Sequence, residues 1–263
     1  MENDFKLIVH QFDKNITIYP IGDVHLGSLE HNELEWERFV EKVSSEPNSY
    51  IVLIGDLMNN ATRSSVSNVF DETLRPREQK KKMIKYLKPI KDKILCAVSG
   101  NHERRSGKDA DNDPMYDIMC KLDLEHLYRQ NIAFMKIQLG KKTKQDRHHP
   151  TYTFAITHGN GGGILTGATV NRNERFAYTI DGLDCLMVGH THKGMVSKPS
   201  KIVIDPRNNS VMFKEMTVVS SQSWMSYGGY AVQKMLLPSS GASSEHAQKL
   251  ILNSKKKDIT VNW

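Results

Sequence analysis

The chain has 263 residues, 38% of them hydrophobic, and its 36 Lys and Arg exceed its 30 Asp and Glu, which gives a formal net charge of +6. No apolar stretch approaches the roughly 20 residues that a membrane-spanning helix needs, so we expect no membrane partner. Residues 1–14 mix charge and polarity and lack the apolar centre of a signal peptide. Cys96, Cys120 and Cys185 are odd in number and lie among apolar residues, which predicts buried free thiols and a cytoplasmic location.

Apolar runs typical of buried strands alternate with amphipathic helical patterns between residues 16 and 188. The predicted strands cover residues 16–21, 50–54, 94–98, 132–139, 152–156 and 186–188. Helices are predicted over 32–45 and 77–87, and a third begins at Pro114 with Asp113 as its N-cap. Alternation of this kind indicates an α/β fold in which helices cover buried sheets.

The C-terminal part of the chain is predicted to add further strands. Alternating runs at 201–205 and 210–219 form a predicted hairpin, and another strand is predicted at 234–237. Two short segments follow, around Leu250 and Ile259.

The whole chain is predicted to form one domain, since no internal repeat or linker interrupts it. The core covers about 16–220, and C-terminal strands and a tail occupy 221–263. Lysine-rich runs lie at 80–88, 141–144 and 255–257. Such runs usually keep a surface solvated, but they also attract polyanions, which leaves nucleic acid open as a partner.

Five of the predicted strands end in residues of the kinds that bind metals. These candidate ligands are Asp23, His25, Asp56, Asn101, His158, His190 and His192. Asp23 and His25 are two residues apart, as are His190 and His192, and residues at that spacing point the same way on an extended segment. We therefore expect one metal site at the strand ends.

The donor types indicate which metals the site would take. Carboxylate, amide and imidazole donors without thiolate suit Mn, Fe or Zn better than Ca, and we expect Mn. Seven protein donors are too many for one catalytic ion with an open position, but they suit two ions that share a carboxylate. Asp56, the lone carboxylate ligand between the two histidine pairs, is the natural bridge.

The charge of such a site indicates its substrate. Two divalent cations against two carboxylates and one hydroxide leave a formal charge of about +1, which attracts an anion. Two ions about 3.5–4 Å apart suit in-line displacement at phosphorus. His102 directly follows Asn101, so it lies close to the metals and is the best candidate to protonate the leaving oxygen.

The ordered motifs Asp-x-His, Gly-Asp, Gly-Asn-His-Glu, His and Gly-His-x-His resemble those of the calcineurin-like metallophosphoesterase superfamily. The resemblance implies a four-layer αββα sandwich of two mixed β-sheets flanked by helices, with a dinuclear metal site at the strand ends. It implies His102 as the catalytic acid. It also implies one ion held by Asp23, His25, Asp56 and His192, and a second held by Asp56, Asn101, His158 and His190.

Departures from the superfamily's motifs bear on the substrate. Its protein serine/threonine phosphatases carry Gly-Asp-x-x-Asp-Arg-Gly at the second motif, where this chain has Asn59 and Asn60 in place of the Asp and the Arg. The Asp would orient the catalytic histidine and the Arg would clamp phosphate. The opening Asp23-Val24-His25-Leu26-Gly27 is more similar to phosphodiesterases and SbcCD-type repair nucleases.

We therefore predict a two-metal hydrolase of phosphate esters, in which metal-bound hydroxide attacks phosphorus and His102 assists the leaving group. The preferred substrate is a phosphodiester of nucleic acid or a nucleotide. The alternative is a phosphomonoester of a phosphoprotein or a small metabolite. A scaffold without turnover and a nucleic-acid binder with incidental metal are the non-enzymatic alternatives, and the scaffold is disfavoured because every site position is present.

Several further residues are secondary candidates for substrate contacts. The polar segments 59–68 and 159–167 are expected to form an open rim for the second arm of a diester. Trp224 and Tyr227 are candidates for base stacking, with a packed turn as the favoured alternative. Four arginines have a surface role as the default and phosphate binding as the alternative: Arg104, Arg105, Arg172 and Arg175.

Overall fold

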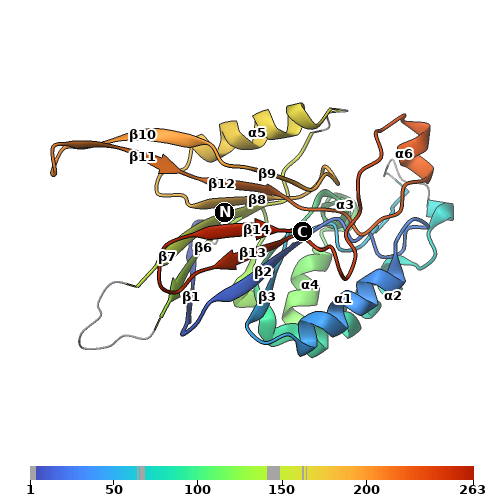
Figure 1. Ribbon diagram of the computed structural model, residues 1–263. Coiled ribbons are helices and arrows are strands. Elements are labelled where there is room, and N and C mark those ends of the chain that lie inside the picture. Colours follow the sequence, from blue (N-terminus) through green and yellow to red (C-terminus); the bar gives the residue numbers. More distant parts are fainter. Residues whose placement is uncertain (1–3, 64, 66–68, 141–148, 162, 164) are drawn as a thin grey trace.

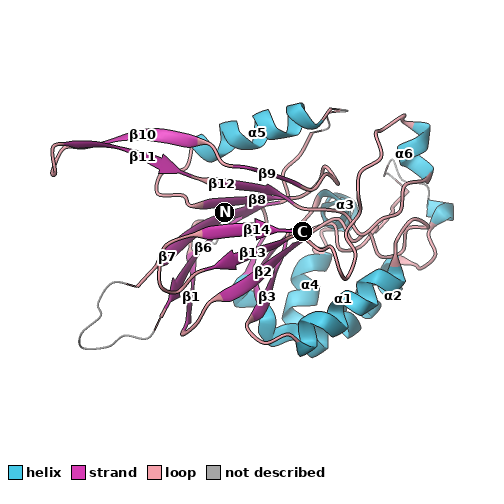
Figure 2. Cartoon of the chain, viewed as in Figure 1, coloured by secondary structure: helices cyan, strands magenta, loops and turns pink. Residues whose placement is uncertain are grey.

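Two six-stranded mixed β-sheets pack face to face, and helices cover their outer faces to give four layers (Figure 1). The computed structural model describes residues 4–63, 65, 69–140, 149–161, 163 and 165–263. Strands form the two middle layers, and the loops after β2, β3 and β4 gather at one end of the sandwich near α3 (Figure 2). The four-layer αββα architecture predicted from the sequence is confirmed.

The first sheet has the strand order β14-β13-β2-β3-β4-β5, in which β2 to β5 run parallel and β13 is antiparallel to both of its neighbours, β2 and β14. Its strands are β2 (Ile16–Ile21), β3 (Ser49–Leu53), β4 (Ile94–Val98), β5 (Tyr128–Arg129), β13 (Lys249–Leu252) and β14 (Ile259–Asn262). The helices on its outer side are α1 (Glu33–Ser45), α2 (Pro76–Leu87) and α4 (Pro114–Lys121). Asn32 and Asp113 cap α1 and α4 through side-chain oxygens that accept backbone N–H groups.

The second sheet has the strand order β1-β6-β7-β8-β12-β9 and is covered by helix α5 (Thr166–Tyr178). Its strands are β1 (Leu7–Phe12), β6 (Ile132–Leu139), β7 (Thr151–Thr157), β8 (Cys185–Val188), β9 (Met195–Ser197) and β12 (Thr217–Ser220). Strands β10 (Ser200–Asp205) and β11 (Ser210–Glu215) pair only with each other within the described residues, as a two-stranded ribbon.

The remaining described helices are short or lie near the loops. They are α3 (Asn101–Ala110), α6 (Gly229–Gln233) and three 3-10 turns, η1 (Val69–Asp71), η2 (Lys88–Lys93) and η3 (Glu125–Leu127). No helix in the described part of the chain combines the length and the apolarity that a bilayer crossing needs.

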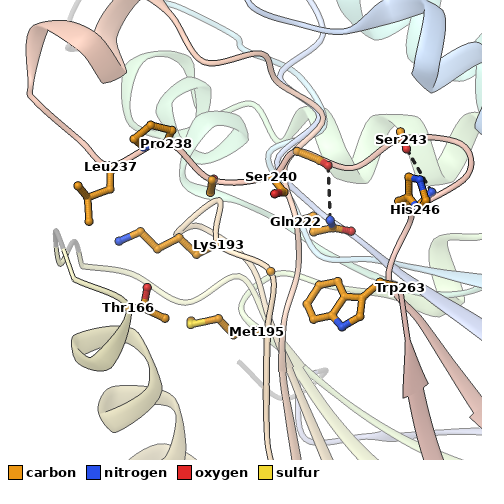
Figure 3. Close-up of a pocket in the computed structure, with 13 residues that line it drawn as sticks. Thr166, Lys193, Met195, Gln222, Leu237, Pro238, Ser240, Ser243, His246 and Trp263 are labelled. Carbon is orange, nitrogen blue, oxygen red and sulfur yellow. Dashed lines mark hydrogen bonds between the residues drawn. The ribbon is translucent and has the colours of Figure 1, made fainter.

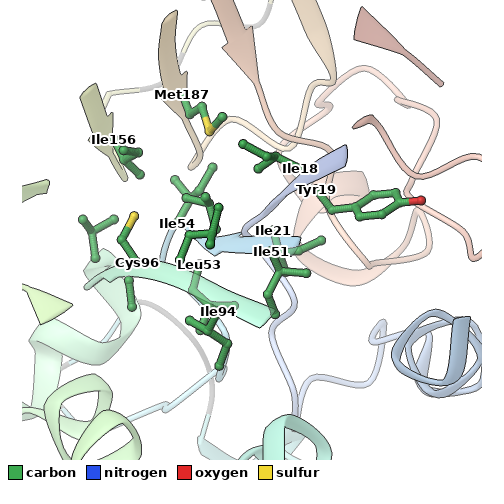
Figure 4. Close-up of a cluster of buried hydrophobic side chains, with 14 of the residues drawn as sticks. Ile18, Tyr19, Ile21, Ile51, Leu53, Ile54, Ile94, Cys96, Ile156 and Met187 are labelled. Atoms are coloured by element: carbon green, nitrogen blue, oxygen red, sulfur yellow. The ribbon is translucent and has the colours of Figure 1, made fainter. Parts of the chain in front are cut away.

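The main core lies between the two sheets. Ile18 and Ile54 from the first sheet lie opposite Ile156 and Met187 from the second, and all four side chains are fully buried (Figure 4). Central strands covered on both faces need apolar residues at successive positions, which explains the unbroken apolar runs in the sequence. Each buried aliphatic side chain contributes about 1.5–3 kcal/mol to the stability of the fold relative to an exposed one. The apolar layer therefore stabilises the packing of the two sheets against each other.

Several local predictions were wrong. The segment 234–237 is not a strand, because the chain turns there and Met235 has a positive φ of 51°. The predicted run at 210–219 breaks at Met216, whose side chain is buried, and its two halves belong to the ribbon and to the second sheet. All three cysteines are free, but Cys120 is only half-buried.

Candidate functional site

The seven predicted ligands converge at the carboxyl ends of strands from both sheets. Asp23 and His25 follow β2, Asp56 follows β3, and Asn101 begins α3 directly after β4 and a short turn. The other three, His158, His190 and His192, follow β7 and β8 of the second sheet. Neighbouring parallel strands end at the same edge of a sheet, which brings loops that are distant in the sequence to one place.

Most of these residues adopt a backbone conformation that L-amino acids rarely take. Positive φ angles occur at Asp23 (53°), His25 (49°), Asp56 (52°), His190 (73°) and His192 (57°). Strands β2 and β8 have already ended at Ile21 and Val188, so the expectation that the pairs sit on extended segments was wrong. Each such residue costs about 1–3 kcal/mol, and strain of this kind concentrates at functional sites.

The first donor group comprises Asp23, His25 and His192. The Nε2 atoms of His25 and His192 are 3.1 Å apart, and Nε2 of His192 lies 3.4 Å from Oδ1 of Asp23. Donors that bind one ion at about 2.1 Å lie roughly 3.0–3.4 Å from one another. The spacing therefore fits three ligands of a single ion.

The second donor group comprises Asp56, His158 and His190, with Asn101 beside them. Oδ1 of Asn101 lies 2.9 Å from Nε2 of His158 and 2.7 Å from Nδ1 of His190. Oδ2 of Asp56 lies 3.2 Å from Nε2 of His158. The amide and carboxylate oxygens thus surround the two imidazoles at ligand spacing.

Asp56 faces the two groups at once. Its Oδ2 lies 3.9 Å from Nε2 of His25 in the first group, as well as close to His158 in the second. Asp23 and Asp56 are almost completely buried, with exposed fractions of 0% and 1%. Buried carboxylates need compensating positive charge, which metal ions held by these donor groups could supply.

Burial and nearby charges shift the pKa values of the histidines in opposite directions. Burial, followed by the charges of His102 and His192, holds the pKa of His25 well below its ordinary value. Burial also lowers the pKa of His158, but the charge of Asp56 and a hydrogen bond to it raise that pKa to about 9. A metal ligand must be a neutral imidazole, so metal binding at His158 would displace a proton.

Glu103 holds the loops of the site, a role that the sequence reasoning missed. Its buried carboxylate accepts hydrogen bonds from the backbone N–H groups of Asp56, Leu57, Met58 and Gly100 at 2.8–3.2 Å. Burial and the charge of Asp56 raise the pKa of Glu103 to about 7. A Glu three residues after a helix cap is half of a capping box. That spacing was the sequence signal from which the structural role of Glu103 could have been predicted.

His102 lies beside Asp56 and His25, and its side chain is only 13% exposed. Its Nδ1 donates to the backbone carbonyl of Asn59 at 2.7 Å, and its Nε2 lies 3.7 Å from Oδ2 of Asp56. Nε2 also accepts a hydrogen bond from Nη2 of Arg105 at 3.0 Å. A carbonyl can only accept and a guanidinium can only donate, so the two partners fix the Nδ1–H tautomer.

Asn59 and Asn60 therefore act differently from the Asp and Arg of the phosphatase motif. The backbone of Asn59, and not its side chain, orients His102. The Asn60 amide donates to the His102 carbonyl at 2.7 Å and to Oγ of Ser106 at 2.9 Å, so it is directed at helix α3. Arg105, one turn after His102, brings a guanidinium to the position beside the imidazole.

Other sequence candidates have partners within the protein. Arg104 donates to the backbone carbonyls of Ser99 and Gly100, and Arg172 to that of Gly161. Trp224 is buried against Trp36 and Phe39, which confirms the packed turn and excludes base stacking at that residue. The lysine run at 141–144 lies outside the described residues.

A four-layer αββα sandwich with carboxylates and imidazoles clustered at its strand ends defines a class of metal-dependent hydrolases of ester bonds. The chain belongs to the calcineurin-like phosphoesterase family, whose sequence model matches residues 16–194. The matched segment contains all seven predicted ligands and His102. None of the curated proteins matches the chain.

One solved structure similar to the chain is that of a conserved uncharacterized protein from Streptococcus pneumoniae TIGR4, described as a predicted phosphoesterase. The two are 11% identical, and the match covers 94% of this chain and 87% of that chain with a TM-score of 0.39. Family membership rests on the sequence match and not on this likeness.

Proposed function

We propose that the chain is a two-metal phosphodiesterase that acts on nucleic acid or nucleotides. The observation that carries the proposal is the position of Asp56, which faces a group of donors on each side. Asp23, His25, Asp56 and His192 would hold one ion. Asp56, Asn101, His158 and His190 would hold the other, with Mn as the preferred metal and Fe or Zn as alternatives.

The chain's own residues supply the acid chemistry. Two bound divalent ions would activate a water molecule and neutralise the charge that develops on phosphorus. His102 presents Nε2 toward this position while the Asn59 carbonyl holds its Nδ1–H, so the protonated ring can donate to the leaving oxygen without losing its orientation. Burial and the charge of Arg105 lower the pKa of His102. Arg105 donates to Nε2 in this structure, so its guanidinium would have to turn to a phosphoryl oxygen before Nε2 could carry the donated proton.

Two features favour a diester. A phosphomonoester carries more negative charge than a diester, and the arginine that clamps it in the related phosphatases is replaced by Asn60, whose amide is engaged with α3. The net charge of +6 favours a polyanionic substrate such as nucleic acid.

The second candidate is a phosphomonoesterase, and Arg105 is the observation that favours it. Its guanidinium lies 3.0 Å from the imidazole of His102 and is placed to contact a further phosphoryl oxygen. Arg105 would then replace, from helix α3, the arginine that the second motif lacks.

The test compares hydrolysis of bis-p-nitrophenyl phosphate and p-nitrophenyl phosphate with Mn²⁺, for the wild type and for His102→Ala. We expect the diester to be preferred, and the substitution to lower the rate about 10²- to 10⁴-fold because the general acid is lost. Metal content, measured in parallel, should stay unchanged in the variant. A monoester preference would favour the second candidate, and an unchanged rate in the variant would remove His102 from the mechanism.

A further inference from the structure

A pocket of about 640 Å³ is lined by residues that adjoin the candidate ligand His192 along the chain and through a backbone contact. Lys193, which directly follows His192, lines it together with Met195, the segment 237–243 and Trp263 (Figure 3). This volume falls in the range of sites that bind small molecules.

The pocket is built from the same loops as the metal centre. The hydroxyl of Ser239 at its wall donates to the backbone carbonyl of His192 at 2.8 Å. Thr166, another lining residue, begins α5 eight residues after His158. Lys193 and Ser239 therefore tie the pocket wall to His192. We infer that one substituent of a phosphate bound at the candidate metal centre would extend toward this pocket.

The lining combines an aromatic face with a cation and neutral polar groups. Trp263 is half exposed, and its ring packs so closely on Gly194 that a Cβ there would lie 2.7 Å from it. The Lys193 ammonium lies 2.9 Å from the Gly163 carbonyl. The buried Gln222 amide donates to the Gly241 carbonyl and accepts from the Gln248 N–H, so it fixes the pocket wall. None of the described lining residues is Asp or Glu, so the pocket suits an anionic or neutral ligand with a flat ring.

We propose that this pocket binds the nucleoside of one arm of a phosphodiester substrate, with its base on the indole of Trp263 and Lys193 toward the adjoining phosphate. Stacking of a base on an aromatic side chain contributes about 1–3 kcal/mol to the binding free energy, and any of the bases can stack in this way. This inference rests on the proposed phosphodiesterase function and names the substrate class as a nucleoside ester.

The kinetic test uses two diesters with the same leaving group, thymidine 5′-(p-nitrophenyl phosphate) and methyl p-nitrophenyl phosphate. We expect the wild type to prefer the thymidine ester by about 10-fold or more in kcat/KM. Trp263→Ala should remove most of this preference through KM, and Trp263→Phe should restore it. Phe213→Ala, which removes an exposed aromatic ring of β11 that is not part of the pocket, is the matched control and should leave the preference unchanged.

Equal rates for the two esters in the wild type, or a preference that survives in Trp263→Ala, would overturn the inference. If neither diester is hydrolysed, the proposed function fails, and the pocket is then judged by binding alone. Adenosine carries no phosphate ester and should still quench the fluorescence of Trp263, since Trp36 and Trp224 are buried. Quenching that is saturable with adenosine and absent with ribose supports the pocket, and no difference between the two overturns it.

Discussion

Among the contacts of single residues, that between Arg105 and His102 says most about the chemistry of the site. Its Nη2 donates to Nε2 of His102, and its Nη1 lies 3.2 Å from the Asn59 carbonyl that holds the other side of the ring. The guanidinium and the imidazole therefore lie side by side, and in the proposed mechanism both would face the leaving oxygen. Charge-assisted hydrogen bonds are about twice as strong as neutral ones, so Arg105 is well placed to stabilise charge there.

Arg105→Gln should lower kcat/KM about 10- to 100-fold, because a hydrogen bond to a charged group contributes about 1.5–3 kcal/mol. The measurement is steady-state hydrolysis of the diester and monoester p-nitrophenyl substrates. Arg175→Gln, which removes the same charge from an exposed position on α5, is the control for net charge. A loss no larger than that of the control would show that Arg105 makes no contact with the substrate, and a loss confined to the monoester would favour the phosphatase alternative.

At the residue scale, the sequence predicted the members of the site but not how they are held. A polar residue shortly after an apolar run is visible without a structure, so the sequence pointed to the seven candidate ligands and His102, whose side chains the structure brings together. The backbone carbonyl of Asn59 leaves no trace in the sequence, because every residue has one. The left-handed φ angles at Asp23 and His190 were equally hidden, since these residue types do not require them.

At the scale of elements, strand β1 joins the two sheets through one half-buried histidine. His10 on β1 contacts the backbone carbonyl of Leu95 on β4 through Nε2 at 2.8 Å, so an edge strand of one sheet is bonded to a strand of the other. Burial lowers the pKa of His10 from its ordinary value near 6.5, although the hydrogen bond to Leu95 raises it in part. The neutral ring is therefore the form that the fold favours.

The free energy of unfolding should fall as the pH drops below about 6.5, because His10 takes up a proton more readily in the unfolded chain than in the folded one. The stabilisation is complete above this pH and is lost as the pH falls toward the lower folded-state pKa. Chemical denaturation of the wild type and His10→Gln across this range measures it. The difference between the two proteins isolates His10 from the other histidines, and parallel curves would contradict the prediction.

The elements themselves were predictable where they bury an apolar stripe. Helix α1 buries Trp36, Phe39, Val40 and Val43 at helical spacing, and its predicted range is confirmed. Helices α3 and α5 were missed because their buried residues are Glu103 in α3, and Thr169, Asn173 and Ala177 in α5, none of which is a large hydrophobic side chain. Polar helices of this kind are fixed by the site and the sheet that they contact, and a sequence pattern does not show those partners.

At the scale of the whole molecule, the candidate metal centre connects the two sheets. Asp23, His25, Asp56 and Asn101 belong to loops of the first sheet, while His158, His190 and His192 belong to loops of the second. Each donor group draws on the two sheets, so bound ions would add cross-links at the end of the sandwich where the loops are most strained. Ligands that bind only the folded state stabilise it by mass action.

The most direct test of the account is an anomalous difference map from crystals grown with Mn²⁺. The account predicts two peaks about 3.5–4 Å apart, one beside Asp23, His25 and His192 and the other beside Asn101, His158 and His190. The Asp56 carboxylate should lie between them, and Asp56→Asn should weaken the two peaks together. A single peak in the wild type, or two peaks that do not share Asp56, would contradict the two-metal centre on which the proposed function depends.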